Sequence, residues 1–187
     1  MRFITARLRS ASPMSQSRQH EEPKLDRESP DAYDERTWMH KLHTMPDGEV
    51  FIPPMALKQA LTDACKMLGL QIPGKGKSTY TKHFEAGVLC MEPIKTGVHK
   101  DQVARDKIQA NSNGIRGSGQ RVPRRFPRLD SWSGEVKFIV LDDIITLDIF
   151  RKHLEVAGTM VGIGRFRPRN GGFYGRFTVE SCTEATS

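Results

Sequence analysis

The chain has 187 residues, of which 37% are hydrophobic, and its formal net charge is +7. This length suits one domain with insertions, and no apolar run approaches the roughly 18 to 20 residues that a membrane span needs. Three widely spaced cysteines, Cys65, Cys90 and Cys182, argue against a disulfide framework or a cysteine-bound metal and favour a reducing, cytoplasmic compartment.

The first predicted element is a strand over residues 2–9, where apolar and polar residues alternate. Residues 14–49 are polar and contain several prolines, and residues 21–49 carry nine acidic against four basic side chains. We interpret residues 14–49 as an acidic insertion after the first strand. Within it, residues 32–42 could form a short helix anchored by Tyr33 and Trp38.

An amphipathic helix follows Pro53 and Pro54, because proline suits the start of a helix. Its expected buried stripe recurs at helical spacing and consists of Leu57, Ala60, Leu61, Ala64, Cys65 and Leu68. Gly69 is a natural end for this helix. The segment "FEAGVLCMEPI", residues 84–94, is then expected to form the second strand.

Residues 95–133 lack a sustained period and form a basic insertion, with nine Lys/Arg against two acids between Lys95 and Arg128. A loop of this length is either functional or contains a small hairpin. "GEVKFIVLDDI" predicts a third strand, Thr146 caps a second helix that ends at Gly158, and "YGRFTVES" predicts a fourth strand.

The order β-α-β-β-α-β predicts an α+β chain, residues 1–187, with a single ferredoxin-like or RRM-like domain interrupted by the two large insertions. Both helices would cover one face of a four-stranded antiparallel sheet. The other face would be open, and such faces commonly bind single-stranded nucleic acid.

The segment "IPGKGKSTYTKHF", residues 72–84, resembles a nucleotide-binding P-loop but does not meet its requirements. The required first glycine is replaced by Gln71, and the loop follows a helix instead of opening one. Lys75, Lys77 and Lys82 are instead suited to phosphate oxygens along a polynucleotide, with a solvated basic loop as the alternative.

The segment "GIGRFRPRNGGFYGRF", residues 162–177, interleaves arginines with aromatic side chains. Arginine can pair with phosphates while flat rings stack on bases, so this composition is typical of contacts with single-stranded nucleic acid. The alternative is a glycine-rich turn whose aromatic side chains cover the core.

No group of residues predicts catalysis, a metal site or a cofactor. His40 and His43 lie three residues apart, but no HExxH motif or Cys/His cluster accompanies them, and we interpret them as surface histidines. Asp142 and Asp143 are best explained as residues that complement a helix N-terminus.

Three segments resemble, in order, features of the RAMP superfamily of CRISPR effector backbone subunits. They are "RFITARLRSASPM" with its Ser-Pro turn, the helix entry "VFIPPMALKQAL", and "GIGRFRPRNGGFYGRF" before the last strand. They cover about 40 of the 187 residues. The helix entry departs from the family pattern "SSLKGALR", since it lacks the Ser-Ser pair and the glycine.

The resemblance implies a subunit that stacks into a filament along a guide RNA, with residues 95–133 as the thumb and residues 14–49 as an inter-subunit element. In some relatives an aspartate of the first insertion cleaves RNA. Asp26, Asp31 and Asp34 occupy that region here, but nothing local marks any of them as catalytic.

We therefore expect non-enzymatic binding of single-stranded RNA or DNA, guide RNA in particular, by a head-to-tail homo-oligomer with other effector-complex subunits as partners. The acidic residues 21–49 of one copy would face the basic stretch of a neighbour. The expected phosphate contacts are Lys58, Lys75, Lys77, Lys82, Arg121, Arg124, Arg125, Arg165, Arg167 and Arg169. The expected stacking residues are Phe166, Phe173 and Tyr174.

Two alternatives remain open from the sequence. One is a phage-encoded protein-interaction module or anti-CRISPR-like decoy subunit that docks to a host complex. The other is a phage accessory protein that binds single-stranded DNA during recombination.

Overall fold

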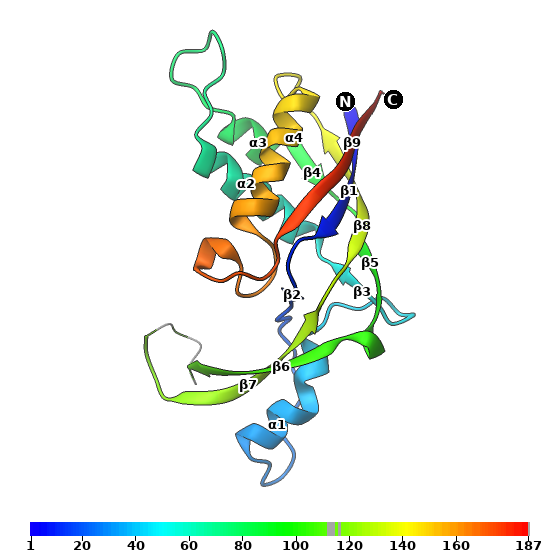
Figure 1. The fold of residues 1–187 in the computed structure, drawn as a ribbon, viewed down its shortest axis with the longest axis vertical. Helices are drawn as coiled ribbons and strands as arrows, with labels where there is room; N and C mark the ends of the chain where they lie inside the picture. The colour runs from blue at the N-terminus through cyan, green and yellow to red at the C-terminus, as the bar shows by residue number, and fades with distance from the viewer. Residues whose placement is uncertain (112–114, 116, 187) are drawn as a thin grey trace.

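The computed structural model describes residues 1–111, 115 and 117–186. Its centre is a four-stranded antiparallel sheet in the order β4-β8-β1-β9. These strands are β1 (Arg2–Ser10), β4 (Val88–Cys90), β8 (Ser133–Val140) and β9 (Phe177–Thr186). Helices α2 (Pro54–Leu68) and α4 (Leu147–Val156) lie on the same side of the sheet (Figure 1). The predicted α+β fold with a ferredoxin-like βαββαβ core is confirmed.

Alternation along the strands divides the sheet into two faces. Ile4, Ala6 and Leu8 of β1 are fully buried beneath the helices. Ile4 and Ala6 stand opposite Phe138 and Val136 of β8, which are also buried. The hydrophobic core therefore lies between the sheet and the two helices, and each large side chain fully buried in it contributes about 1.5 to 3 kcal/mol.

Helix α2 has the predicted boundaries and the predicted apolar stripe. Pro54 is its first residue and Gly69 ends it. Five of the six residues expected to face the core are buried, whereas Leu68, at the end of the helix, is only half-buried. None of the helices among the described residues is long and apolar enough to cross a membrane.

The second strand is shorter than expected. Residues Thr81–Gly87 form a helix, α3, and only Val88–Cys90 pair with β8 as β4. Lys58 of α2 explains this difference, because its Nζ donates hydrogen bonds to the carbonyls of Phe84, Glu85 and Val88. Phe84 is thus buried on a helical turn and Val88 at the start of β4, whereas Ala86 is exposed, an arrangement that a strand prediction based on local composition does not anticipate.

Gly158 does not end α4. The chain continues through a π-helical turn, η3 (Ala157–Val161), before the helix is broken. A Cβ at Gly158 would lie 2.2 Å from the carbonyl oxygen of Phe177. Glycine at this position therefore permits the close approach of β9 to the helix.

The two insertions contain regular elements of their own. The first holds β2 (Met14–Ser15), α1 (Pro30–Thr37) and the 3-10 turn η1 (Trp38–Lys41), and it leads into β3 (Glu49–Ile52). The second holds β5 (Ile94–His99), η2 (Lys100–Gln102), β6 (Ala104–Asn111) and β7 (Arg121–Leu129). The 3-10 turn η4 (Pro168–Asn170) lies in the Gly-rich loop, which we define as residues 162–176.

The insertions are far apart in sequence but fold onto each other. β2 pairs with β7, β3 pairs with β5, and β6 and β7 form a long antiparallel hairpin. This hairpin and α1 lie below the central sheet in Figure 1, and the loop between α2 and α3 lies at the opposite end of the molecule. Residues 112–114 and 116 of the basic insertion lie outside the described residues.

Candidate nucleic-acid interface

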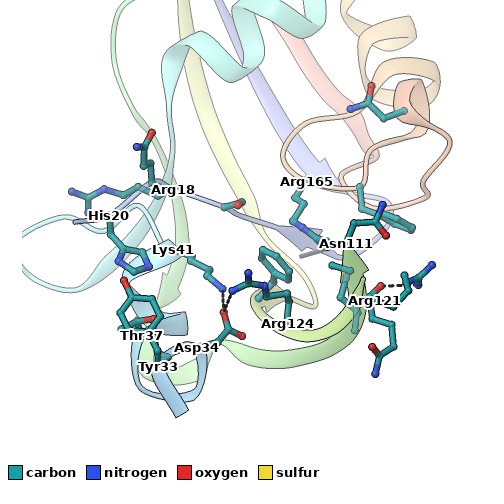
Figure 2. A pocket seen from close by; sticks show the side chains of 18 of the residues that line it. Arg18, His20, Tyr33, Asp34, Thr37, Lys41, Asn111, Arg121, Arg124 and Arg165 are labelled. Atoms are coloured by element: carbon teal, nitrogen blue, oxygen red, sulfur yellow. Dashed lines mark hydrogen bonds and ion pairs between the residues drawn. The ribbon is translucent and has the colours of Figure 1, made fainter. Parts of the chain in front are cut away.

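A cavity of about 800 Å³ opens where the two insertions meet the Gly-rich loop. We call it the groove. Figure 2 shows His20, Tyr33 and Lys41 on one side of it and Arg165, Asn111 and Arg121 on the other. Its floor is the β6–β7 hairpin, and the residues that line it include Arg18, Arg124, Phe126, Phe166 and Asn170.

The groove is strongly cationic. Among the described residues that line it, five are Lys or Arg and only Asp34 is acidic. A concave surface lined by one sign of charge focuses its electric field and attracts polyanions. The five cations are Arg18, Lys41, Arg121, Arg124 and Arg165.

Two of these cations lie over the same aromatic ring. The guanidinium carbon of Arg165 is 3.5 Å from the centroid of Phe126, and the Nζ of Lys41 is 4.4 Å from it. Burial lowers the pKa of both Arg165 and Lys41 from their usual values. Because Arg165 is already partly desolvated, contact of its guanidinium with a phosphate costs less than at a fully hydrated arginine. Lys41 contributes positive charge to the groove, but its Nζ already donates to Asp34 Oδ1 and to the carbonyl of Arg125, both at 2.6 Å.

Asp34 holds the cationic wall in place. It is 2% exposed and accepts hydrogen bonds from Lys41 Nζ, at 2.6 Å, and from the backbone N–H of Arg125, at 2.5 Å. Its carboxylate also lies 3.8 Å from the guanidinium of Arg124. Asp34 of α1 thus orients cations from η1 and β7. Its contact with the backbone of Arg125 spans 91 residues of sequence, and no local pattern reveals it.

The Gly-rich loop forms the second wall because its backbone folds tightly. Gly175 has a φ of +78°, and a Cβ there would lie 1.8 Å from the carbonyl oxygen of Ile163. The backbone N–H of Arg165 donates to the carbonyl of Ser15 at 2.8 Å, which fixes the loop against β2. Phe166 has a φ of +59°, an unfavourable backbone conformation for a residue with a side chain, and is 50% exposed.

Tyr174 ties this loop to the hairpin. Its hydroxyl donates to Asp106 Oδ2 of β6 at 2.7 Å, and its ring makes edge-to-face contacts with the rings of Phe166 and Phe173. Asp106 also accepts from Arg128 Nη1 at 2.6 Å. In the described contacts the tyrosine thus supports the wall of the groove, whereas Phe166 lines the groove directly.

The structure brings together only some of the residues expected to contact phosphate or bases. Arg121, Arg124, Arg165 and Phe166 line the groove. Phe173 is exposed outside it, and Lys75, Lys77 and Lys82 lie on or beside the loop at the far end of the molecule (Figure 1). Contact with nucleic acid stays a prediction for all of these residues.

The remaining expected contacts are engaged within the protein. Lys58 binds three carbonyl groups near the end of α3. Arg125 is 5% exposed, and its guanidinium donates to Asp31 Oδ1 at 2.8 Å. Arg167 and Arg169 both face the buried carboxylate of Asp63 on α2, at 3.8 and 3.2 Å.

The acidic and basic stretches of the sequence meet inside one chain. Arg125 pairs with Asp31, Arg105 pairs with Glu35, and Arg124 lies 3.8 Å from Asp34. The separation of charge along the sequence therefore needs no neighbouring copy to balance it. Head-to-tail assembly stays a prediction, but the separation of charge along the sequence no longer supports it.

The open face of the sheet is less suited to a polyanion than the groove. Arg7 and Arg9 both pair with Glu180 of β9, at 3.5 Å.

The three aspartates considered for cleavage differ in their surroundings. Asp31 and Asp34 pair with cations of the hairpin and η1, and exposed Asp26 lies 4.0 Å from Arg27.

Five of the basic and aromatic residues that line the groove were not predicted from the sequence: Arg18, His20, Tyr33, Lys41 and Phe126. Four of them lie in the first insertion. Its net negative charge conceals the cations that it contains. Phe126 lies in "RRFPR", which has the same interleaving of arginine and aromatic residues as the Gly-rich loop, so this pattern could have identified it.

Similar solved structures agree with the predicted fold. No family model and no curated protein matches the sequence. The crystal structure of Cmr6 from Pyrococcus furiosus superposes with a TM-score of 0.54 and 11% identity, over 95% of this chain and 97% of that one. A chain in the cryo-EM structure of the Type III-B Cmr-beta bound to cognate target RNA superposes with a TM-score of 0.55 and 11% identity. The match covers 99% of this chain and 61% of that one. This chain therefore has the RAMP-like fold that its sequence resemblance implies.

Proposed function

We propose that this protein binds single-stranded nucleic acid in the groove, with guide RNA as the preferred ligand, and that it does so without cleaving it. The observation that carries the proposal is the combination of five cations and three aromatic side chains, Tyr33, Phe126 and Phe166, around one cavity. Cations would pair with the backbone phosphates, and exposed rings would stack on bases.

The fold supports a more specific role. One of the similar structures is that of a Type III-B Cmr complex bound to target RNA. By analogy of fold, the protein would act as a subunit of a CRISPR-type effector assembly, with other subunits as partners and repeated copies along the strand. The pairing of Asp31 and Asp34 with internal cations supports a binding role for the first insertion over a catalytic one.

Phe166 offers the sharpest test of this function, because its conformation is unfavourable for folding. A residue with a side chain in the left-handed region costs about 1 to 2 kcal/mol, and glycine there avoids that cost. We expect Phe166→Gly to raise the free energy of unfolding by about 0.5 to 1 kcal/mol, since part of the gain is offset by the entropy of glycine in the unfolded chain. The same change should weaken binding of single-stranded RNA about tenfold, the loss of one stacked base.

Urea unfolding and fluorescence anisotropy with a labelled RNA measure the two effects. Phe173→Ala is the matched control, because Phe173 is an equally exposed aromatic residue of the same loop outside the groove. If base stacking is confined to the groove, Phe173→Ala should change RNA affinity much less than Phe166→Gly does, the remaining effect being the loss of its contact with Tyr174. A wild-type protein that binds no single-stranded RNA at low salt would overturn the proposed function, and an unaltered affinity in Phe166→Gly would remove Phe166 from the interface.

A further inference from the structure

His20 occupies an unusual position in the wall of the groove. Its Nδ1 is buried and has no hydrogen-bond partner among the described residues. Its ring lies 5.6 Å from the ring of His40 and 6.1 Å from that of Tyr33, measured between centroids. A buried polar atom without a partner costs free energy, so it calls for an explanation such as a ligand.

The charges around His20 are mostly positive. Lys41 and His40 approach from η1, Arg18 lies on the same segment, and Glu22 is the acidic residue that opposes them. From α1 the ring of Tyr33 faces it. Arg124 of β7 lies beside Lys41, 3.8 Å from Asp34, whereas Arg121 of β7 and Arg165 of the Gly-rich loop lie across the groove.

This setting keeps the imidazole neutral while the groove is empty. Burial, followed by the nearby His40 and Lys41, lowers the pKa of His20 below its ordinary value. An anion in the groove would reverse the electrostatic balance, because a negative charge within a few ångströms favours the protonated imidazole. The ring would then supply a further charge-assisted hydrogen bond to the ligand.

We propose that His20 is a proton-coupled contact of the groove, which takes up a proton as a nucleic-acid phosphate binds and thereby makes affinity depend on pH. This inference rests on the proposed function and adds a mode of regulation to it. His20 gains the proton only when ligand is present, so the affinity of the wild-type protein rises as pH falls from about 8 to about 6.

The size of the effect follows from linkage. A difference of one pKa unit between the free and the bound protein corresponds to a tenfold difference in affinity between the two protonation states. Because the titration is incomplete between these pH values, we expect the wild type to bind single-stranded RNA roughly three- to sixfold more tightly at about pH 6 than at about pH 8. His20→Gln, which cannot titrate, should reduce this ratio to less than about twofold.

Fluorescence anisotropy with one labelled single-stranded RNA at both pH values measures the ratio. His40→Gln is the matched control, because it removes the neighbouring imidazole, which is exposed and lies 4.0 Å from Glu22, and should keep most of the pH dependence. His20→Asn is a second neutral variant, used if urea unfolding shows that His20→Gln is not folded. Isothermal titration calorimetry in two buffers of different ionisation enthalpy should show proton uptake on binding by the wild type and not by the His20 variant.

The outcomes separate the two proposals. RNA binding whose pH ratio is the same in the wild type and the His20 variants overturns the role of His20 and leaves the groove as the binding site. Absence of RNA binding by the wild type at both pH values overturns both proposals.

Discussion

Replacing Arg124 and Arg165 together by alanine is expected to weaken the binding of single-stranded RNA by at least about a hundredfold. Each arginine should make one charge-assisted contact with a phosphate, and such contacts contribute about 1.5 to 3 kcal/mol each. Both side chains line the groove, from opposite elements of it. The fold should persist, because neither guanidinium is part of the hydrophobic core.

Lys75→Ala with Lys77→Ala is the control that this structure suggests. This variant also removes two positive charges, but it removes them from the exposed loop at the far end of the molecule (Figure 1). If general electrostatic attraction is the only effect there, affinity should fall no more than about threefold. Equal losses in the two double variants would show that the groove is not the binding site.

The second large effect concerns stability. Asp34→Ala is expected to lower the free energy of unfolding by about 3 to 5 kcal/mol, the usual cost of removing one partner of a buried ion pair. Lys41 Nζ would lose its acidic partner, and the backbone N–H of Arg125 would lose its acceptor. Because the same contacts orient Lys41 over Phe126, any folded fraction should also bind RNA more weakly.

Asp26→Ala provides the comparison for Asp34. Both aspartates belong to the first insertion, but Asp26 is exposed and pairs at most weakly with its neighbour Arg27. We expect its substitution to change the free energy of unfolding by less than about 0.5 kcal/mol. Urea unfolding monitored by circular dichroism measures both variants, and a small effect of Asp34→Ala would contradict its role in holding the wall of the groove.

The core of this fold could be predicted from sequence because it follows local periodic patterns. Alternation in β1 and the helical spacing of the α2 stripe each depend on residues close together in the chain. The same local patterns located Arg165 and Phe166, since arginine, glycine and aromatic residues are concentrated in one short segment.

The walls of the groove could not be predicted in the same way. Asp34 and Arg125 meet across 91 residues, and Tyr174 and Asp106 across 68. Neither pair leaves a spacing or a periodic pattern to detect. Moreover, the net negative charge of the first insertion conceals Arg18 and Lys41, whose importance comes only from their position opposite the Gly-rich loop.

Composition alone also does not distinguish the surroundings of individual cations. Lys58, Arg125, Arg167 and Arg169 count equally with Arg165 in the net charge of the sequence. In the fold, Lys58 binds carbonyl groups and the three arginines face carboxylates. A basic residue therefore becomes a candidate for phosphate contact only when the fold leaves its charge directed into an open cavity.

The salt dependence of RNA affinity tests the central claim most directly. If several of the five groove cations neutralise phosphates, counterions are released, and the affinity of the wild-type protein for single-stranded RNA should fall steeply between about 50 and 200 mM salt. With three to five contacts, the slope of log affinity against log salt should be about −2 to −3.5, and it should become shallower by about 1.4 in the Arg124 and Arg165 double variant. A slope near zero in the wild type, or an unchanged slope in that variant, would contradict the assignment of the groove as a nucleic-acid interface.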